Sequence, residues 1–219
     1  MKKLVVFLLM GIVFASGCAV TRSEVPSGVV KTESSTPDNG KQIVIRSVSD
    51  DRRFEDAPKV PSIPTMDVDR IAEVSDDLKL RAIGRKRNGF GRALGDVLLR
   101  EGEGVDTVVA TSLGNAFDAL GYEVVEDSAA SEQVIPVDIS IKKMWCWIEL
   151  GFASGTHSCE VETEATIVNG ENVAKKLVLQ TRIDESVMVV TESDWTERLQ
   201  ELAGKYTTIS ETKLKEAGM

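Results

Sequence analysis

The sequence predicts an α+β domain, with a mixed or mostly antiparallel sheet and two main helices packed on one of its faces. Apolar and polar residues alternate over residues 137–150, 159–168 and 174–190, as they do in half-buried strands. Residues 105–120 and 195–209 instead carry apolar residues at helical spacing. Because several strands follow one another between the two helices, the order favours helices on one face over an alternating parallel fold.

The N-terminal segment has the pattern of a secretory signal peptide. Lys2 and Lys3 precede an uncharged stretch from Leu4 to Ala15, which is shorter than the ~20 residues needed to cross a bilayer. The run Ala15-Ser16-Gly17-Cys18 resembles a bacterial lipobox, although Leu is commoner than Ala at its first position. This resemblance implies cleavage before Cys18 and attachment of lipid to its sulfur. An ordinary secretory signal with a cysteine near the cut is the alternative.

The expected domain organisation follows from this cleavage site. We expect residues 1–17 to be removed, residues 18–41 to form a lipidated flexible tether, and residues 42–219 to form a single α+β domain. No Asp follows Cys18, where it would resemble an inner-membrane retention signal. The expected location is therefore the outer membrane, with the domain facing the periplasm. A Gram-positive source would instead place the chain on the outer face of its single membrane.

The charge balance limits the classes of partner. With 26 Lys and Arg against 35 Asp and Glu, the chain has a formal net charge of −9. Nucleic acid is not an expected partner, because phosphate contacts need a basic surface. The same balance argues against attraction of the whole surface to anionic lipid head groups.

The segment before the first helix is expected to contain one short strand and then an irregular loop. Residues 43–45 begin the folded part, and three prolines between residues 51 and 69 exclude a helix interior. Within this segment, the mixed-charge run of residues 50–56 is interpreted as a solvated face. Calcium ligation is the alternative, but the run lacks the spacing of an EF-hand.

Both helices have recognisable ends. The helix over residues 105–120 is terminated by Gly121 and followed by a strand over residues 122–125. Thr191 and Asp194 predict a capping box at the start of the last helix. The apolar stripe of this helix consists of Trp195, Leu199, Leu202, Tyr206 and Ile209.

Cys146 and Cys159 form an even pair once Cys18 carries lipid, and they favour a disulfide in an oxidising compartment. Residues 151–155 predict a hairpin turn between the two strands. Pairing Cys146 opposite Cys159 then places both sulfurs on the apolar face, at the close spacing of a non-hydrogen-bonded pair. Two reduced thiols are an alternative, while a metal site would need more ligands than these.

Positive charge and glycine are concentrated between residues 81 and 100. Arg85, Lys86, Arg87 and Arg92 are candidates to bind the phosphate of an anionic lipid or of lipopolysaccharide, or an acidic partner surface. The intervening glycines would let backbone amides approach such an anion. Their spacing fits neither a Walker A loop nor a dinucleotide-binding fingerprint. The alternative is a solvated loop whose charges pair with the protein's own carboxylates.

Trp145 and Trp147 share one face of their strand, opposite Cys146, and are candidate interface aromatics. The alternative is that a helix covers both rings. His157, the only histidine, is expected on the surface at the mouth of the hairpin, because neither a nucleophile elbow nor further zinc ligands accompany it. No catalytic residue, cofactor or metal is expected.

The order of elements resembles the YajG-type group of small bacterial outer-membrane lipoproteins. The shared features are a lipobox, a short first strand, and a helix ending Phe117-x-x-Leu120-Gly121-Tyr122 before a strand, a long hairpin and a closing helix. The resemblance implies a small envelope domain and transfers no functional residues.

We therefore expect a lipid-anchored, non-enzymatic envelope protein that assists the assembly or stability of a larger cell-envelope complex through a protein partner. A lipid- or lipopolysaccharide-binding accessory protein is the alternative, and it needs an apolar pocket under the helices. A peptidoglycan hydrolase is the enzyme hypothesis, and it needs a cleft with two carboxylates and a raised pKa.

Overall fold

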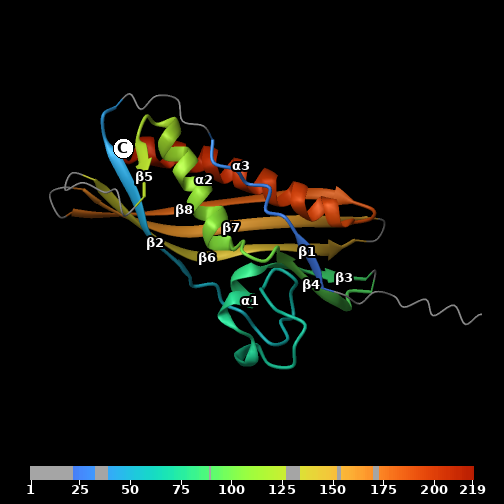
Figure 1. Ribbon diagram of the computed structural model, residues 1–219. Helices are drawn as coiled ribbons and strands as arrows, with labels where there is room; N and C mark the ends of the chain where they lie inside the picture. The colour runs from blue at the N-terminus through green and yellow to red at the C-terminus, as the bar shows by residue number, and fades with distance from the viewer. Residues whose placement is uncertain (1–21, 33–38, 89, 127–133, 152–153, 170–172) are drawn as a thin grey trace, which may run out of the picture.

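The computed structural model describes residues 22–32, 39–88, 90–126, 134–151, 154–169 and 173–219. Within these residues, an eight-stranded mixed sheet carries two main helices, α2 (Val105–Ala119) and α3 (Glu192–Glu216), side by side on one face (Figure 1). The predicted α+β class with two main helices is confirmed.

The long strand β6 (Ile135–Leu150) organises the sheet. Its first half pairs in parallel with β2 (Gln42–Asp50), and its second half meets β3 (Ala82–Arg87) at Cys146. Its other edge pairs with β7 (Gly155–Asn169) from Val137 to Leu150. The remaining strands extend the sheet outward: β4 (Ala93–Leu99) and β1 (Ser23–Val25) beyond β3, β5 (Glu123–Val125) beyond β2, and β8 (Val173–Val187) beyond β7.

The β6–β7 hairpin has the register that the sequence predicts. Cys146 lies opposite Cys159 with a Cα–Cα distance of 4.0 Å, and the two sulfurs form a disulfide. Both cysteines belong to the main core between the sheet and the helices. The predicted disulfide is confirmed.

The last helix begins as predicted, but the residues that face the sheet near its C-terminal end differ from the predicted ones. The capping box of Thr191 and Asp194 is present. Four of the five stripe residues are buried, but Ile209 is 37% exposed. Ser210 and Leu214 take the inward positions instead, because steps of four residues from Tyr206 stay on the side that faces the sheet.

The folded domain begins earlier than residue 42. Residues 23–25, within the predicted tether, form β1, which pairs in parallel with β4. Val25 is 2% exposed, and the backbone N–H and hydroxyl of Ser27 donate to the Glu103 carboxylate at 3.0 and 3.2 Å. Three residues are too short for strand alternation to stand out among Ser, Pro and Gly, so the composition of this segment predicted a tether.

A second, smaller core lies on the other face of the sheet. Residues 51–70 cross this face with the irregular course that the prolines predicted, followed by the 3-10 turn η1 (Ile71–Glu73) and the short helix α1 (Asp76–Arg81). Figure 1 shows this segment on the side of the sheet away from α2 and α3. The side chains buried there are Met66, Val74, Ala82, Leu98, Trp145 and Trp147.

The mixed-charge run at the start of this segment is not a solvated face throughout. The side chain of Arg52 is 0% exposed, while that of its neighbour Arg53 is 87% exposed. Two nitrogens of Arg52 donate to Asp50 at 2.7 and 2.8 Å. Because successive side chains of an extended segment point to opposite sides, one arginine of this pair lies in the interior and the other in water.

Candidate functional site

Three connections gather at one end of the sheet. β6 ends at Leu150, β7 begins at Gly155, β8 passes into α3 through residues 188–191, and β3 turns into β4 around Phe90 (Figure 1). We call this the hairpin end. Two hollows of about 460 and 330 Å³ open there. Both are lined by Arg87, Ile148 and Leu150.

The four predicted basic residues lie near the hairpin end but do not form one cluster. Arg85 pairs with Asp67 at 2.5 Å, and its side chain is only 14% exposed. Lys86 donates to the Ser23 hydroxyl at 2.7 Å, on the side of β1 and α3. Arg87 lines both hollows, and burial together with the charge of Arg85 lowers its pKa. Arg92 is exposed.

The expected glycine-rich loop is instead a hairpin, in which residues 82–87 and 93–99 are the paired strands β3 and β4. Binding of an anion by these residues stays a prediction. Asn88 Oδ1 accepts hydrogen bonds from the amides of Phe90 and Arg92 at 3.0 and 2.9 Å, so these amides face a side chain of the turn itself. Gly91 has a φ of 79°, the left-handed conformation that a tight turn requires. Gly89 lies outside the described residues.

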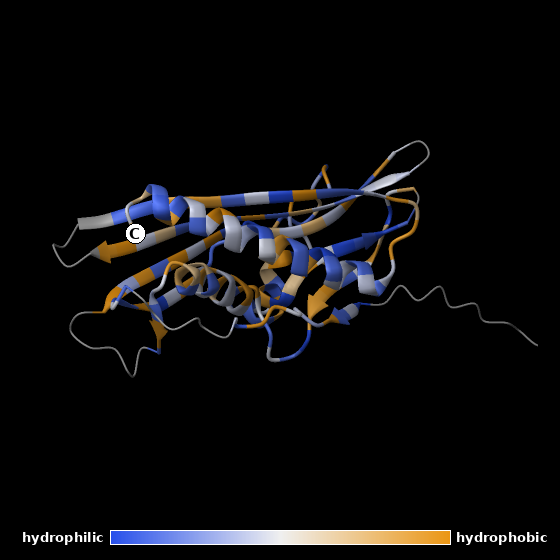
Figure 2. Ribbon diagram, turned by 90° about the horizontal axis from the view of Figure 1, so that it is seen from above, coloured by the Kyte–Doolittle hydropathy of each residue, from blue (hydrophilic) through white to orange (hydrophobic). Residues whose placement is uncertain are grey.

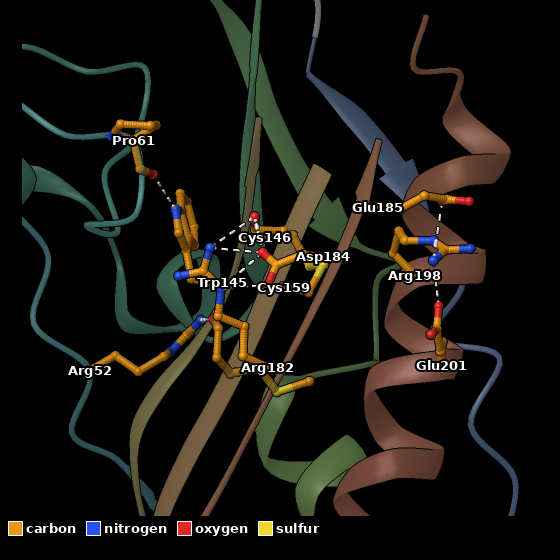
Figure 3. The surroundings of a disulfide bond; sticks show 12 residues. Arg52, Pro61, Trp145, Cys146, Cys159, Arg182, Asp184, Glu185, Arg198 and Glu201 are labelled. Atoms are coloured by element: carbon orange, nitrogen blue, oxygen red, sulfur yellow. Dashed lines mark hydrogen bonds and ion pairs between the residues drawn. A yellow bond between two sulfur atoms is a disulfide. The ribbon is translucent and has the colours of Figure 1, made fainter. Parts of the chain in front are cut away.

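Trp145 and Trp147 are each 1% exposed, so neither ring offers an interface patch. The irregular segment covers Trp145, whose indole N–H donates to the Pro61 carbonyl at 3.1 Å (Figure 3). The Trp145 ring also meets Phe54 edge to face. Trp147 lies beneath Arg182 and Lys143, which stand 4.9 and 5.1 Å from its ring centroid. A loop thus covers Trp145 and two cations cover Trp147, whereas the alternative considered from the sequence was a helix over both rings.

His157 is buried, contrary to the expected surface position. It lies on β7 against Trp195 of α3, with ring centroids 4.5 Å apart, and is 0% exposed. Neither ring nitrogen has a hydrogen-bond partner among the described residues, and burial lowers the pKa of His157 to about 4. Its neighbour Ser158 donates to Asp184 at 2.6 Å, so the two side chains form no nucleophile–base pair.

Two carboxyl groups have a raised pKa, and they occupy separate environments. Burial raises the pKa of Asp96 on β4, which accepts from the Asp67 amide at 2.8 Å and pairs with Arg22. Burial also raises the pKa of Asp118 near the end of α2, where Lys31 and the Val124 amide are its neighbours. Among the described residues, no three His, Cys, Asp or Glu side chains are grouped as a metal site.

The space between the helices and the sheet is filled. The void there measures about 10 Å³ and is bounded by α2, α3 and the middle of β6 and β7. A single water molecule needs a volume of this size, and an acyl chain needs far more. The apolar interior therefore offers no lipid site in the described structure.

β8 presents a long open edge. It pairs with β7 over fifteen residues, and no other strand of the described chain pairs with it. Its stretch from Leu177 to Thr181 carries no charge, and Val178 is 58% exposed. The backbone groups along this edge are available to another strand.

Exposed apolar side chains at the hairpin end are a feature that sequence reasoning missed. Phe90, Met188 and Val189 are 97%, 87% and 77% exposed. The run Val187-Met188-Val189-Val190 directly before the capping box was the available signal, because four apolar residues rarely occupy an exposed connection. Assigning this run to a longer strand concealed it.

Cys18, the predicted lipidation site, lies outside the described residues, so its modification stays a prediction. In the part of the chain that the structure describes, none of the helices has the length and apolarity that a membrane crossing requires.

No protein-family model matches the chain, and no match is found among curated proteins. Among solved structures, the chain is similar to protein XCC0632 from Xanthomonas campestris, described as DUF330, with 8% identity, a TM-score of 0.44 and coverage of 91% of this chain and 100% of that one. A minor lipoprotein from Acinetobacter baumannii has 13% identity and a TM-score of 0.31, over 48% of this chain and 83% of its own. Likenesses this distant support no argument about function, and the YajG-type resemblance stays a prediction.

Proposed function

We propose that the chain is a lipid-anchored, non-enzymatic envelope protein that assists the assembly or stability of a larger cell-envelope complex through protein–protein contacts. The lipobox-like run ending at Cys18 supports the anchor. The proposed location is the outer membrane, with the domain in the periplasm. The open edge of β8 is the observation that carries the proposal of a protein partner.

A long open strand edge with an uncharged middle is unusual on a protein that acts alone. Native edge strands are commonly shortened, covered, bulged or charged, because their free N–H and C=O groups invite pairing. The charged residues of β8 are Lys175 and Lys176 near its start and those from Arg182 onward, so residues 177–181 in the middle carry no charge. A strand from a partner would extend the sheet there, with main-chain hydrogen bonds supplying affinity and side chains such as Val178 supplying specificity.

The two alternative functions have weaker support in the geometry. Lipid or lipopolysaccharide binding in the interior would need a cavity of several hundred cubic ångströms, and the void under the helices is about 10 Å³. Hydrolysis of peptidoglycan would need two carboxyl groups facing one cleft, whereas Asp96 and Asp118 have different neighbours.

The partner is tested by crosslinking in living cells. A photoreactive residue at Val178 is expected to capture one dominant envelope protein, and the same residue at Val30, which is 74% exposed in a connection beside α2, is the matched control. For the second experiment the photoreactive residue is placed at Thr181 instead. Two further substitutions in that variant, Val178→Lys and Gln180→Lys, should abolish capture, because a charged edge resists pairing. Recovery of the chain with bound lipid alone would favour the lipid-handling function instead.

The anchor is tested separately. Cys18→Ser is expected to abolish labelling by fatty acid and to stop membrane attachment through lipid. Fatty-acid labelling that survives this substitution would contradict the anchor.

A further inference from the structure

The three most exposed large apolar side chains of the described residues are all at the hairpin end. Phe90 is at the turn between β3 and β4, and Met188 and Val189 are in the connection from β8 to α3, which is strongly apolar in Figure 2. Leu150, at the end of β6, is 46% exposed beside them and lines both hollows. A soluble surface rarely gathers such side chains without a contact that covers them.

The start of the folded chain is at the same end of the molecule. β1 begins at Ser23 and pairs there with Val97, and Lys86 and Glu192, which line the larger hollow, both hydrogen-bond to the Ser23 hydroxyl. Figure 1 shows β1 beginning beside the β3–β4 hairpin. The chain therefore enters the fold at the hairpin end, and a group attached shortly before Ser23 lies near that end.

The chain between Cys18 and the fold is short. Only Ala19, Val20 and Thr21 separate Cys18 from Arg22, the first described residue. A fully extended chain gains at most about 3.6 Å per residue, so Arg22 lies within about 14 Å of the Cys18 backbone. A head-group layer is itself about 5–8 Å thick. A lipid on Cys18 would thus hold the hairpin end against the membrane surface.

The charges at this end suit such a surface. Lys59 and Arg87 line the smaller hollow, Lys86 and Arg87 line the larger one, and Arg92 is exposed in the β3–β4 turn. Glu149 and Glu192 also line the hollows, where they accept hydrogen bonds from the Trp147 indole at 2.9 Å and from Ser23. The four cations at this end outnumber these two carboxylates. Because the whole chain carries a net charge of −9, an anionic bilayer repels most of its surface and favours the approach of this end.

We propose that the hairpin end docks on the phospholipid bilayer that holds Cys18, with Phe90, Met188 and Val189 entering the head-group layer. The proposal rests on the lipid anchor of the proposed function. It adds a fixed orientation, in which β8 lies across the sheet from β1 and its edge stays open to a periplasmic partner. Single apolar side chains on separate turns, with cations at the same end, suit the head-group layer of a bilayer, because each side chain can insert independently of the others.

The test places a fluorescent label in the lipidated full-length protein, reconstituted into vesicles of phosphatidylethanolamine and phosphatidylglycerol. Labels are attached to Phe90→Cys and Met188→Cys, and Val30→Cys is the control because Val30 is comparably exposed but lies beside α2. The acylated Cys18 and the Cys146–Cys159 disulfide leave the new thiol as the reactive one. An unchanged thermal midpoint checks that each labelled protein is folded.

Nitroxide-bearing phospholipid is expected to quench the labels at positions 90 and 188 at least about threefold more than the label at position 30, and aqueous iodide to quench them less. Equal quenching by iodide at all three positions, in protein whose mass shows acylated Cys18, would overturn the docking and leave the anchor intact. A mass without acyl chains would overturn both. Shielding from both quenchers that grows with protein density would show a second copy on this end and would also overturn the proposal.

Discussion

The guanidinium of Arg52 joins three parts of the chain. It donates to the carbonyl oxygens of Lys79 and Ala82 at 2.6 Å and of Met144 at 2.9 Å, while Asp50 balances its charge. These carbonyls belong to the end of α1, the start of β3 and the middle of β6. One side chain thus fixes the irregular segment against the sheet (Figure 3).

Arg52→Ala is expected to lower the free energy of unfolding by about 3–5 kcal/mol, because it leaves buried carbonyls and a carboxylate without their donor. Arg53→Ala is the matched control and should cost less than about 0.5 kcal/mol, since its side chain is 87% exposed and its contact with Glu55 is 3.6 Å long. Urea unfolding of both variants measures the difference. Equal losses would contradict the structural role of Arg52.

Alternation along β6 predicted which face Trp145 and Trp147 share, but not what lies over that face. The covering segment contacts Trp145 through Pro61 and Phe54, more than eighty residues away, and no local pattern encodes that contact. The same holds for Arg52, which has the composition of a surface residue and a buried environment. Tertiary contacts decide whether such residues are exposed or buried. The sequence therefore predicted the strand face of the two tryptophans correctly, but not the exposure of these side chains.

The β6–β7 hairpin is the element on which the disulfide acts. Reduction, or the double substitution Cys146→Ser and Cys159→Ser, is expected to lower the free energy of unfolding by about 3 kcal/mol, because the bond closes a short loop with thirteen residues of sequence separation. Urea unfolding with and without reductant measures the change. Mass analysis should show two hydrogens fewer in the native protein than in the reduced protein. An unchanged mass on reduction would contradict the disulfide.

Long elements were predictable and short ones were not. Periodicity indicated α2, α3 and the register of the β6–β7 hairpin, because each repeats its pattern over many residues and has a turn or cap at its end. β1 has three residues and α1 has six, so neither repeats a pattern enough to be recognised. In the β3–β4 hairpin, glycines and the consecutive charges Arg85-Lys86-Arg87 hid the strands, since they interrupt the alternation of apolar and polar residues.

At the scale of the whole molecule, the structure separates two surfaces. The hairpin end collects exposed apolar side chains and cations, and the β8 edge offers free backbone groups on the outer margin of the sheet. The confirmed fold brings the first surface together from three connections, which lie around residues 90, 150 and 188 of the sequence. No sequence motif marks it, because its parts meet only when β3 and β8 take their places beside the central hairpin.

The stability of the whole domain should depend on pH through its single histidine. The unfolded chain binds a proton on His157 near pH 6.5, whereas burial, and then the charge of Arg198, hold the folded pKa at about 4 despite the opposing effect of Asp194. Between these values the unfolded state carries the extra proton, so stability is full above pH 6.5 and falls as the pH falls toward 4.

From pH 7.5 to pH 5 the expected loss in the free energy of unfolding is about 2 kcal/mol, and His157→Leu should abolish it, since leucine fills the site without a proton to bind. The carboxylates with a lowered pKa, Asp51, Asp138, Asp184 and Asp194, add their own loss mainly at more acidic pH, because an unfolded Asp titrates near 3.8. Urea unfolding at the two pH values measures both proteins. Asp96 and Asp118, whose pKa burial raises, act in the opposite direction, so the difference between the two proteins isolates the histidine. The same change in stability in the wild type and in His157→Leu would contradict the buried, uncharged state of His157 between β7 and α3.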